Sequence, residues 1–440
     1  MSQEIKEFHS LTDYIKMPYW EITMKIGLLI IASEVLDGKI TDLNTRYLAE
    51  YLKGQNLELE VTTTVRDRED DILKGLADLF QSAQLVISSG GLGPTKDDLT
   101  KKVIGQYFER EHVYSPAAHQ VAETNYQRLN RTYPGKEHGY SFLPEGFLPL
   151  ENATGFAPGF YAEGDDKFLI AAPGVPREFK SIINDHLGNW IKKNIQVPQF
   201  MENIIIRTKK VPEEKIFGEV DPFLWDKLEA FGDVSSLPVL MGVDIGVKIK
   251  ASGENELTLK KQAVFQIIKD SPICSSVWNW GPEKLEEVIV MRANELGLKF
   301  GFAESCTGGL CSQRITNVSG SSKSFFGSVI CYDTAVKINQ LNVSPLTISN
   351  KGVVSTETAE EMATGLARLW KLDLAISTTG IAGPNGGTIE NPVGTVCIGI
   401  HSAQKQTSIK LHLFGDREQL KERFAQAALM ALWETMEEFA

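Results

Sequence analysis

Apolar segments of strand length alternate with amphipathic segments of helix length along the first part of the chain. Strands separated by helices of this length form right-handed βαβ units, in which parallel strands share one sheet and helices cover both of its faces. We therefore predict a parallel α/β domain over residues 24–195. Its predicted elements lie at residues 25–32, 44–52, 57–65, 70–80, 85–95 and 168–176, with a last helix that continues to about residue 190.

The pattern changes near residue 195. Short strand and helix patterns now follow in a mixed order, which predicts a small α+β module over residues 196–280 that is similar to a KH domain. The module has no GxxG segment between helices and no basic run, so RNA binding is not expected of it. The plainer interpretation is a spacer or an arm for dimerisation. The predicted elements are strands at 204–207, 243–252 and 273–278 and helices at 212–220 and 256–269.

A third pattern occupies residues 281–440. It opens with a helix over 281–299 and ends with a helix that begins at Arg417. Between them lie four strand patterns, which read FGFAES, SVICY, LAISTTG and TVCIGI. We predict a C-terminal α/β domain here. Residues 1–23 mix acids, bases and aromatics, and we interpret them as an N-terminal extension rather than a signal peptide.

Composition excludes several classes of protein. Of the 440 residues, 42% are hydrophobic and 23% are charged, which is ordinary for a globular protein with buried cores. The net charge of −12 argues against a general nucleic-acid-binding protein, which needs clustered cations. Five cysteines without a CxxC pair fit reduced thiols. The apolar runs fall short of the roughly 20 residues that span a bilayer, so we expect a cytoplasmic protein without a membrane partner.

Ser305 is the first residue with candidate chemistry. It lies in GFAESCTGGL, which predicts a strand, a small polar turn and a helix that begins near Cys306. A serine at such a turn exposes its hydroxyl beside free backbone N–H groups, which can hold an oxyanion or a phosphate. Taken alone, Ser305 is better explained as a helix cap. Cys306 is a rival nucleophile, but no histidine is positioned by sequence to activate it; His401 and His412 lie in strand patterns.

Four further segments carry small polar or charged residues at predicted strand ends. Tyr332 and Lys337 lie at the end of a strand in VICYDTAVK, and Arg417 starts the last helix in FGDR. The other two segments are TTGIAGPNGGT at 378–388 and NPVGT at 391–395. An open α/β sheet binds its ligand at the carboxyl ends of its strands, so a cluster of such turns predicts a site there.

These five segments together resemble the C-terminal domain of the CinA family, from about Glu283 onward. The resemblance implies an amidase that converts nicotinamide mononucleotide into nicotinate mononucleotide and ammonia without a cofactor. By position, Ser305 is the nucleophile, Lys337 is its base, and Tyr332 orients or relays the proton. A desolvated lysine can be neutral near pH 7 and activate a serine. The resemblance also implies amide-site and phosphate roles for Thr379 and Arg417, and substrate contacts for Thr307, Gly308, Gly309, Gly380 and Gly383.

A second constellation lies in the first domain. SSGGLGPTKDDLT (88–100) follows a strand and precedes a helix; its glycines admit a phosphate, and paired acids can hold a divalent cation. This segment resembles the MoaB/MogA-like, molybdopterin-binding fold of the family's N-terminal domain. That resemblance implies an ADP-ribose pyrophosphatase dependent on Mg²⁺ or Co²⁺. The implied metal residues are Asp98, Asp97, Asp67 and Asp42, and the implied nucleotide or phosphate residues are Gly90, Gly91, Gly93, Thr95, Asn44, Glu34, Pro173 and Gly174.

The chain departs from the family pattern at three places. Ala32 replaces a glycine after the first strand, and HGYSF (138–142) replaces a run that contains a lysine. Y-D-T-A-V-K (332–337) replaces the usual Asn-Glu-Ala before the lysine.

Three functions follow from the sequence: a bifunctional salvage enzyme, which we favour; a pyrophosphatase with an altered amidase domain; and a non-catalytic, competence-associated regulator. A homodimer is expected by resemblance only.

Overall fold

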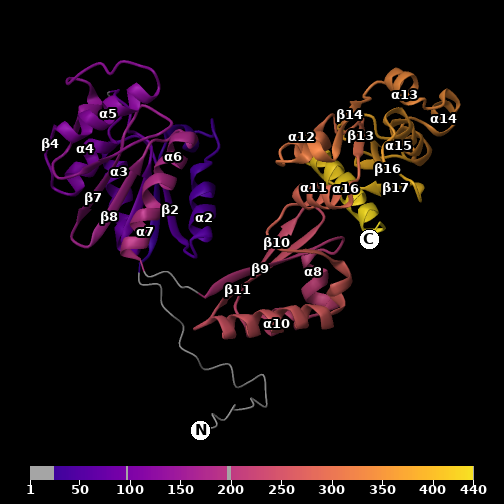
Figure 1. Ribbon diagram of the computed structural model, residues 1–440, viewed down its shortest axis with the longest axis horizontal. Helices are drawn as coiled ribbons and strands as arrows, with labels where there is room; N and C mark the ends of the chain where they lie inside the picture. Colours follow the sequence, from indigo (N-terminus) through magenta and orange to yellow (C-terminus); the bar gives the residue numbers. More distant parts are fainter. Residues whose placement is uncertain (1–23, 96–97, 196–199, 440) are drawn as a thin grey trace, which may run out of the picture. The chain divides into compact units, whose positions relative to one another are not determined.

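The computed structural model describes residues 24–95, 98–195 and 200–439 of the chain. These residues form two compact units (Figure 1). Unit 1 holds the described residues up to Glu202 together with Lys250–Leu257. Unit 2 holds Asn203–Ile249 and the described residues from Thr258 onward. In the part of the chain that is described, no helix is both long and apolar enough to cross a membrane.

Unit 1 is built on a six-stranded sheet in the order β2-β1-β3-β8-β7-β6. The strands β2, β1, β3 and β8 are parallel, whereas β7 and β6 are added antiparallel at one edge. All six residues of β1 are buried, because apolar side chains on both faces pack under helices. The strands are β1 (Ile26–Ile31), β2 (Leu59–Val65), β3 (Leu85–Ser89), β6 (Leu148–Leu150), β7 (Gly159–Gly164) and β8 (Lys167–Ala172).

The helices of unit 1 cover both faces of this sheet (Figure 1). The fold confirms the predicted parallel α/β class, and the antiparallel additions β4 to β7 and helix α5 were not predicted. The helices are α1 (Ser33–Leu36), α2 (Asn44–Gly54), α3 (Glu69–Ser82), α4 (Thr100–Tyr107), α5 (Pro116–Arg128), α6 (Pro176–Ile182) and α7 (Gly188–Asn194). A separate ribbon pairs β4 (His112–Tyr114) with β5 (Phe142–Pro144).

The middle of the chain forms a four-stranded sheet in the order β10-β11-β9-β12. The prediction of a strand over 273–278 was wrong over residues 273–276. Ser271 caps a short 3₁₀ helix over Pro272–Ser276, and only then does the strand begin. Helix α9 and strand β10 were not predicted. The elements are β9 (Met201–Thr208), α8 (Glu213–Lys215), α9 (Leu224–Glu229), β10 (Asp233–Val239), β11 (Gly242–Lys250), α10 (Glu254–Asp270) and β12 (Val277–Trp280).

The C-terminal domain has a five-stranded sheet in the order β14-β13-β15-β16-β17. Strands β14, β13 and β15 are parallel, β16 is antiparallel to β15, and β17 is antiparallel to β16. The strands are β13 (Phe300–Glu304), β14 (Phe325–Ile330), β15 (Leu374–Gly380), β16 (Thr395–Ser402) and β17 (Gln406–His412).

Helices cover both faces of this second sheet (Figure 1). The core on one face joins side chains of α11, α12 and α16, and the core on the other face joins side chains of α13 and α15. The helices are α11 (Leu285–Leu296), α12 (Leu310–Thr316), α13 (Thr334–Leu341), α14 (Pro345–Lys351), α15 (Thr356–Trp370) and α16 (Arg417–Glu437). His401 and His412 lie in β16 and β17, as their strand patterns predict.

Two local predictions in this domain were wrong. The helix expected near Cys306 begins at Leu310, because Gly308 and Gly309 have φ values of +62° and +100° that no helix contains. Strand β14 ends at Ile330, so Lys337 lies on helix α13 rather than at a strand end. The helix starts there because the side chain of Asp333 accepts a hydrogen bond from the Ala335 amide.

The middle sheet packs against the C-terminal helix within unit 2. Lys209 and Lys210 both donate to the Glu434 carboxylate, at 2.8 Å each. The rings of Trp278 and Trp433 meet edge to face at 5.7 Å, and Lys209 lies 4.8 Å from the Trp433 ring centroid. Aromatic contacts and a partly buried ion pair therefore fix strand β12 and the chain after β9 to helix α16.

The close packing of α13 against α15 generates a stability prediction. A Cβ atom added at Gly365 would lie 1.8 Å from the Leu341 carbonyl oxygen, so Gly365→Ala must push the two helices apart. We expect a loss of about 1–3 kcal/mol in the free energy of unfolding of unit 2, measured by urea denaturation. Gly218→Ala is the control, since nothing described lies within 4 Å of its added Cβ. Equal stability of the two variants would contradict the packing.

Candidate functional site

The topology of the C-terminal sheet brings its polar turns to one edge. Strands β13, β14 and β15 are parallel, and β17 runs in the same direction as β15 because each is antiparallel to β16. The turns that contain Ser305, Tyr332, Gly380 and Arg417 therefore leave the sheet on the same side. This is the edge at which the sequence predicted a site, and the convergence follows from the strand directions alone.

Lys337 and Ser305 are in direct contact at this edge. The Lys337 Nζ lies 3.0 Å from the Ser305 Oγ, and it donates to the carbonyl oxygens of Cys331 at 2.6 Å and Tyr332 at 3.2 Å. The side chain of Lys337 is fully buried, and Ser305 is 8% exposed. In the charged form Nζ can donate to all three oxygens; in the neutral form, N–H bonds to the two carbonyls would leave its lone pair for the serine hydroxyl.

Burial lowers the pKa of the Lys337 ammonium below the ordinary lysine value. Desolvation disfavours the charged form of an amine, and no carboxylate forms an ion pair with Lys337 among the residues that the structure describes. The lowered pKa increases the neutral fraction of the amine near pH 7. The contact therefore has the geometry that a serine nucleophile and a general base require.

The backbone after Ser305 forms a turn with two unused amides. The Ser305 amide donates to the Thr378 carbonyl at 3.0 Å, which fixes the end of β13 against β15. In contrast, the amides of Cys306 and Thr307 meet no acceptor oxygen of another residue within the described chain. Two adjacent N–H groups beside a nucleophile match the donors that stabilise an oxyanion.

Glu304, directly before the nucleophile, is a buried carboxylate that the sequence analysis did not single out. It is 0% exposed. It accepts hydrogen bonds from the amides of Gly309, Cys311 and Ser312 at 2.9, 3.1 and 3.0 Å. The Ser312 hydroxyl adds a contact of 2.5 Å. Glu304 therefore ties the end of β13 to the start of α12.

Cys306 is disfavoured as a rival nucleophile. Burial raises the pKa of its thiol to about 12, so the thiolate that attacks a substrate is scarce at neutral pH. Its Sγ instead fills space beneath Gly380, where an added Cβ would lie 3.2 Å from the sulfur and 2.6 Å from the Thr395 carbonyl. Gly380 is thus required by close packing next to the nucleophile.

Arg417 and Tyr332 form the exposed side of the site. The Arg417 guanidinium donates to the Gly383 carbonyl at 2.6 Å and lies 3.4 Å from the Tyr332 hydroxyl. Tyr332 is 65% exposed, so its ring is accessible from solvent. A guanidinium held at the first residue of α16 is well suited to an anionic group.

Two predicted site residues use their hydroxyls within the protein. The register pairs Glu304 with Thr378, so Thr379 continues beside Ser305 at the ends of adjacent strands. The Thr379 hydroxyl donates to the Val353 carbonyl at 2.9 Å. The Thr307 hydroxyl is fully buried and lies 2.8 Å from that of Thr378, so the backbone amide of Thr307, rather than its side chain, is left for a ligand.

The carboxyl edge of the unit 1 sheet gathers most of the residues predicted there. Asn44 donates from Nδ2 to the Ser89 hydroxyl and to the Gly174 carbonyl, each at 2.9 Å. The buried Oδ1 of Asn44 and the Oγ of Ser88 have no hydrogen-bond partner in the described structure. An added Cβ at Gly174 would come within 3.3 Å of Gly90, so the two glycine turns approach closely. Buried orphan acceptors beside such turns are typical of a ligand site.

The predicted metal residues are not brought together as a cluster. Asp67 accepts from the amide and hydroxyl of Ser33, both at 2.8 Å. Asp98 accepts from the Gly93 and Thr95 amides at 2.8 and 3.0 Å, and Asp42 caps the start of α2. Within the described ranges, no group of three His, Cys, Asp or Glu side chains is arranged to hold a metal ion. Asp97 lies outside the described residues, and the metal assignment stays a prediction.

A buried lysine on helix α4 contacts the loop that lacks the lysine of the family pattern. Lys101, on α4, donates from Nζ to the Gly139 carbonyl at 2.6 Å, within the run HGYSF. Burial lowers the pKa of Lys101 to about 8. The sequence offered no signal for Lys101, because its partner is 38 residues away along the chain.

Two further residues predicted for this site differ in burial. Glu34 is exposed on α1, and Pro173 is buried after β8.

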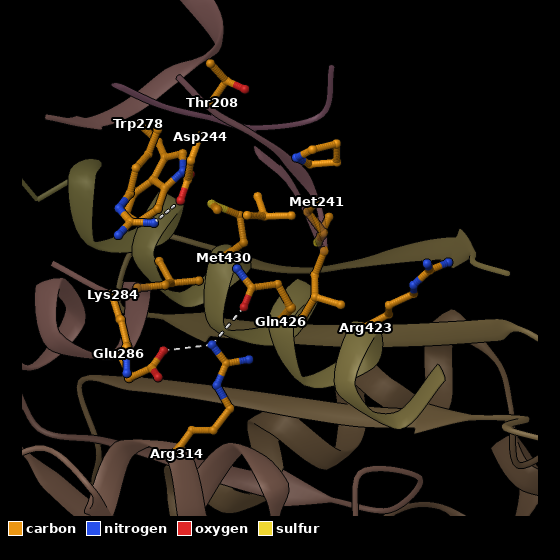
Figure 2. A pocket seen from close by; sticks show the side chains of 15 residues that line it. Thr208, Met241, Asp244, Trp278, Lys284, Glu286, Arg314, Arg423, Gln426 and Met430 are labelled. Carbon is orange, nitrogen blue, oxygen red and sulfur yellow. Dashed lines mark hydrogen bonds and ion pairs between the residues drawn. The ribbon is translucent and has the colours of Figure 1, made fainter. Parts of the chain in front are cut away.

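Unit 2 also contains a cavity of about 550 Å³ between the β10–β11 hairpin and helices α12 and α16 (Figure 2). Arg314, from α12, donates there to Glu286 and to Gln426, each at 2.7 Å. None of the predicted site residues lines this cavity. The ion pair between Arg314 and Glu286 fixes the C-terminal end of α12, which is distant from the turn at residues 305–309 (the nucleophile turn).

Comparison with known proteins defines the class of the chain. Residues 282–436 match the CinA C-terminal domain, and residues 27–193 match the probable molybdopterin binding domain. The protein therefore joins a MoaB/MogA-like domain to a CinA-like domain, as the resemblance implied.

The chain belongs to the CinA family. It is 35% identical over 412 residues to a putative competence-damage inducible protein of Halothermothrix orenii, covering 92% of this chain and 97% of the relative. It is 32% identical to a CinA-like protein of Kosmotoga olearia, with the same coverage of 92% and 97%. Among solved structures, the competence/damage inducible protein CihA of Agrobacterium tumefaciens is 30% identical, with 36% of this chain and 99% of that chain covered and a TM-score of 0.34.

The Lys337–Ser305 contact generates a prediction about pH. If the neutral amine of Lys337 acts as the base, the reactivity of Ser305 falls as pH decreases through the lowered pKa of Lys337. Labelling of Ser305 by a fluorophosphonate, followed by mass spectrometry, should therefore rise with pH to a midpoint below the ordinary lysine value of about 10.4. Lys351→Ala, an exposed lysine, is the control. A midpoint at or above the ordinary value would refute the assignment of Lys337 as base.

Proposed function

We propose that the C-terminal domain is a nicotinamide mononucleotide deamidase, an amidohydrolase that releases ammonia and nicotinate mononucleotide. The observation that carries this proposal is the 3.0 Å contact between the Ser305 hydroxyl and the buried amine of Lys337. The proposed substrate is inferred from the family resemblance, and the Ser305–Lys337 contact supports attack on its carboxamide. The proposed role of the whole chain is the salvage of pyridine nucleotides.

The proposed reaction has two halves. Lys337 takes the proton of Ser305, and the Oγ attacks the carboxamide carbon to form a tetrahedral oxyanion, which the Cys306 and Thr307 amides stabilise. The intermediate collapses as the Lys337 ammonium returns the proton to the leaving nitrogen, so ammonia departs and an ester remains on Ser305. Water, deprotonated by the same amine, then attacks the ester; the Lys337 ammonium returns that proton to the departing Ser305 Oγ, which frees the nicotinate product and restores both groups.

Substrate binding is assigned to the exposed side of the site. Arg417 is proposed to bind the nucleotide phosphate, because its guanidinium is held by the Gly383 carbonyl at the mouth and faces Tyr332. Tyr332 is proposed to position the substrate beside the nucleophile. Guanidinium recognition of phosphate is strong and directional, so loss of Arg417 should act on binding more than on chemistry.

The altered run before Lys337 does not favour the alternative of a disabled amidase domain. Asp333 takes over as the cap of α13, and Lys337 still lies within hydrogen-bond distance of Ser305. Burying an ionisable amine destabilises the fold, and a regulator without catalytic activity does not require an amine in contact with a hydroxyl. The geometry therefore supports the enzyme over both alternatives.

The deamidase proposal predicts the following. Wild-type protein incubated with nicotinamide mononucleotide should release ammonia, and Ser305→Ala and Lys337→Ala should each reduce kcat by at least about 1,000-fold, because nucleophile and base act as one unit. Ammonia release is measured with a coupled assay. Ser324→Ala removes a buried hydroxyl that has no hydrogen-bond partner among the described residues, and this variant and Lys351→Ala are matched controls that should retain activity. Absence of ammonia release by the wild-type protein would exclude the proposal.

A second activity is proposed for unit 1, hydrolysis of the pyrophosphate of ADP-ribose. The unpartnered Oδ1 of Asn44 and Oγ of Ser88 favour it, since they lie at the edge where the resemblance expects a nucleotide. The glycine turns at Gly90 and Gly174 approach each other closely at the same edge. The divalent cation, Mg²⁺ or Co²⁺, is assigned to Asp98 together with Asp97. The carboxylates of Asp98, Asp67 and Asp42 already accept hydrogen bonds from the protein.

The pyrophosphatase proposal predicts release of AMP from ADP-ribose in the presence of Mg²⁺ or Co²⁺, measured by chromatography. Asp98→Asn should reduce the rate by at least about 10-fold, because it weakens the carboxylate that shapes the phosphate turn. Asp78→Asn, on the exposed side of α3, is the control. Deamidase activity should persist in both variants, since it resides in unit 2; its loss would show that the substitution unfolds the chain.

A further inference from the structure

The carboxylate of Glu304 is a buried anion whose charge is balanced without a cation. It forms no ion pair with any residue that the structure describes, and hydroxyl and amide dipoles provide its solvation. Burying a carboxylate costs several kcal/mol unless its oxygens are hydrogen-bonded, so a complete set of donors is needed. The donors are the amides of Gly309, Cys311 and Ser312 and the hydroxyls of Ser312 and Ser328.

These hydrogen bonds determine which amides of the nucleophile turn remain free. The amides of Gly308 and Leu310 bond within the turn to the carbonyls of Ser305 and Thr307, at 3.2 and 3.3 Å. Glu304 occupies the amides that follow. The turn is therefore closed at its end, and only the two amides directly after Ser305 are available for an oxyanion.

Glu304 cannot itself touch the substrate. Successive side chains of a strand point to opposite faces, so Glu304 lies on the α12 side of β13 and Ser305 continues on the α13 side, where Lys337 packs. The backbone of Glu304, in contrast, is linked to Lys337 through Cys331. The Glu304 carbonyl accepts from the Cys331 amide at 2.8 Å, and the Cys331 carbonyl in turn accepts from Lys337.

We propose that Glu304 is the positioning residue of the amidase site, a role that rests on the proposed function. Its carboxylate holds the Ser305–Gly309 turn in the one shape that presents the Cys306 and Thr307 amides to a developing oxyanion. The nucleophile and its base are connected to the same residue through its backbone. Glu304 acts on the rate of acyl transfer and leaves the binding of the nucleotide phosphate to Arg417.

The other end of α12 provides a matched control. Arg314 ties that end of the helix to Glu286 and Gln426 at the cavity shown in Figure 2, at 2.7 Å each. Arg314→Met removes this anchor and disturbs the same helix without touching the turn. If Glu304 serves only to hold α12 in place, the two substitutions should have similar effects on catalysis.

The test compares Glu304→Gln with Arg314→Met in the full-length chain. Glu304→Gln presents an amide where backbone N–H groups require acceptors, so we expect kcat for nicotinamide mononucleotide to fall by about 100-fold, the usual effect of losing an oxyanion donor. We expect KM within about 3-fold of wild type and an unchanged pH midpoint, because Lys337 is not altered. Arg314→Met should change kcat by less than about 3-fold even if it lowers the melting temperature equally.

Fluorophosphonate labelling of Ser305 separates this proposal from the choice of substrate. The labelling rate should fall in Glu304→Gln as kcat does, even if nicotinamide mononucleotide is not the substrate, since a phosphonyl oxygen occupies the same amides. Where Glu304→Gln does not fold, Ser312→Ala removes one hydroxyl donor and should lower the labelling rate by about 3- to 10-fold, as expected for one hydrogen bond. Labelling at the wild-type rate in either variant, or an equal loss in Arg314→Met, would overturn the role of Glu304.

Discussion

The C-terminal site depends on burying one amine, that of Lys337, where desolvation lowers its pKa. Lys337 is fully buried and touches Ser305, and its two other hydrogen-bond partners are carbonyl oxygens, which carry no full charge to hold the amine protonated. A carboxylate in their place would stabilise the ammonium and remove the base. The end of β14, the Asp333 cap and the start of α13 are all needed to hold these carbonyls and Nζ together.

The strand pattern predicted the edge of each sheet at which the polar residues meet. Continuous apolar runs such as that of β1 are typical of parallel strands buried on both faces, and parallel strands bring their carboxyl ends to one edge. Ser305, Lys337 and Arg417 could therefore be expected at one place without any contact being known. The small antiparallel elements, such as β10, escaped prediction because their exposed residues leave no periodic signal.

The interior partners of the site could not be predicted from sequence. Glu304 reads as an ordinary strand-end acid, and its buried position follows only once the glycines at 308 and 309 fold α12 back over it. The extra turn that these glycines create also explains why the expected start of α12 was placed too early. Lys101 is similar, since its contact with Gly139 depends on two distant segments packing together.

In each unit the candidate site lies at the carboxyl ends of the parallel strands, but the two sites carry different chemical groups. In unit 2 the edge combines a hydroxyl, a buried amine with a lowered pKa and free amides, the set that the proposed attack on an amide carbon requires. In unit 1 the described edge offers amides, orphan oxygens of Asn44 and Ser88, and carboxylates, without a nucleophile paired to a base. Such a set can hold a phosphate but needs a further activating group to cleave it. The reaction proposed for unit 1 therefore requires a component beyond its described side chains, whereas the reaction proposed for unit 2 has a candidate base, Lys337, within the site.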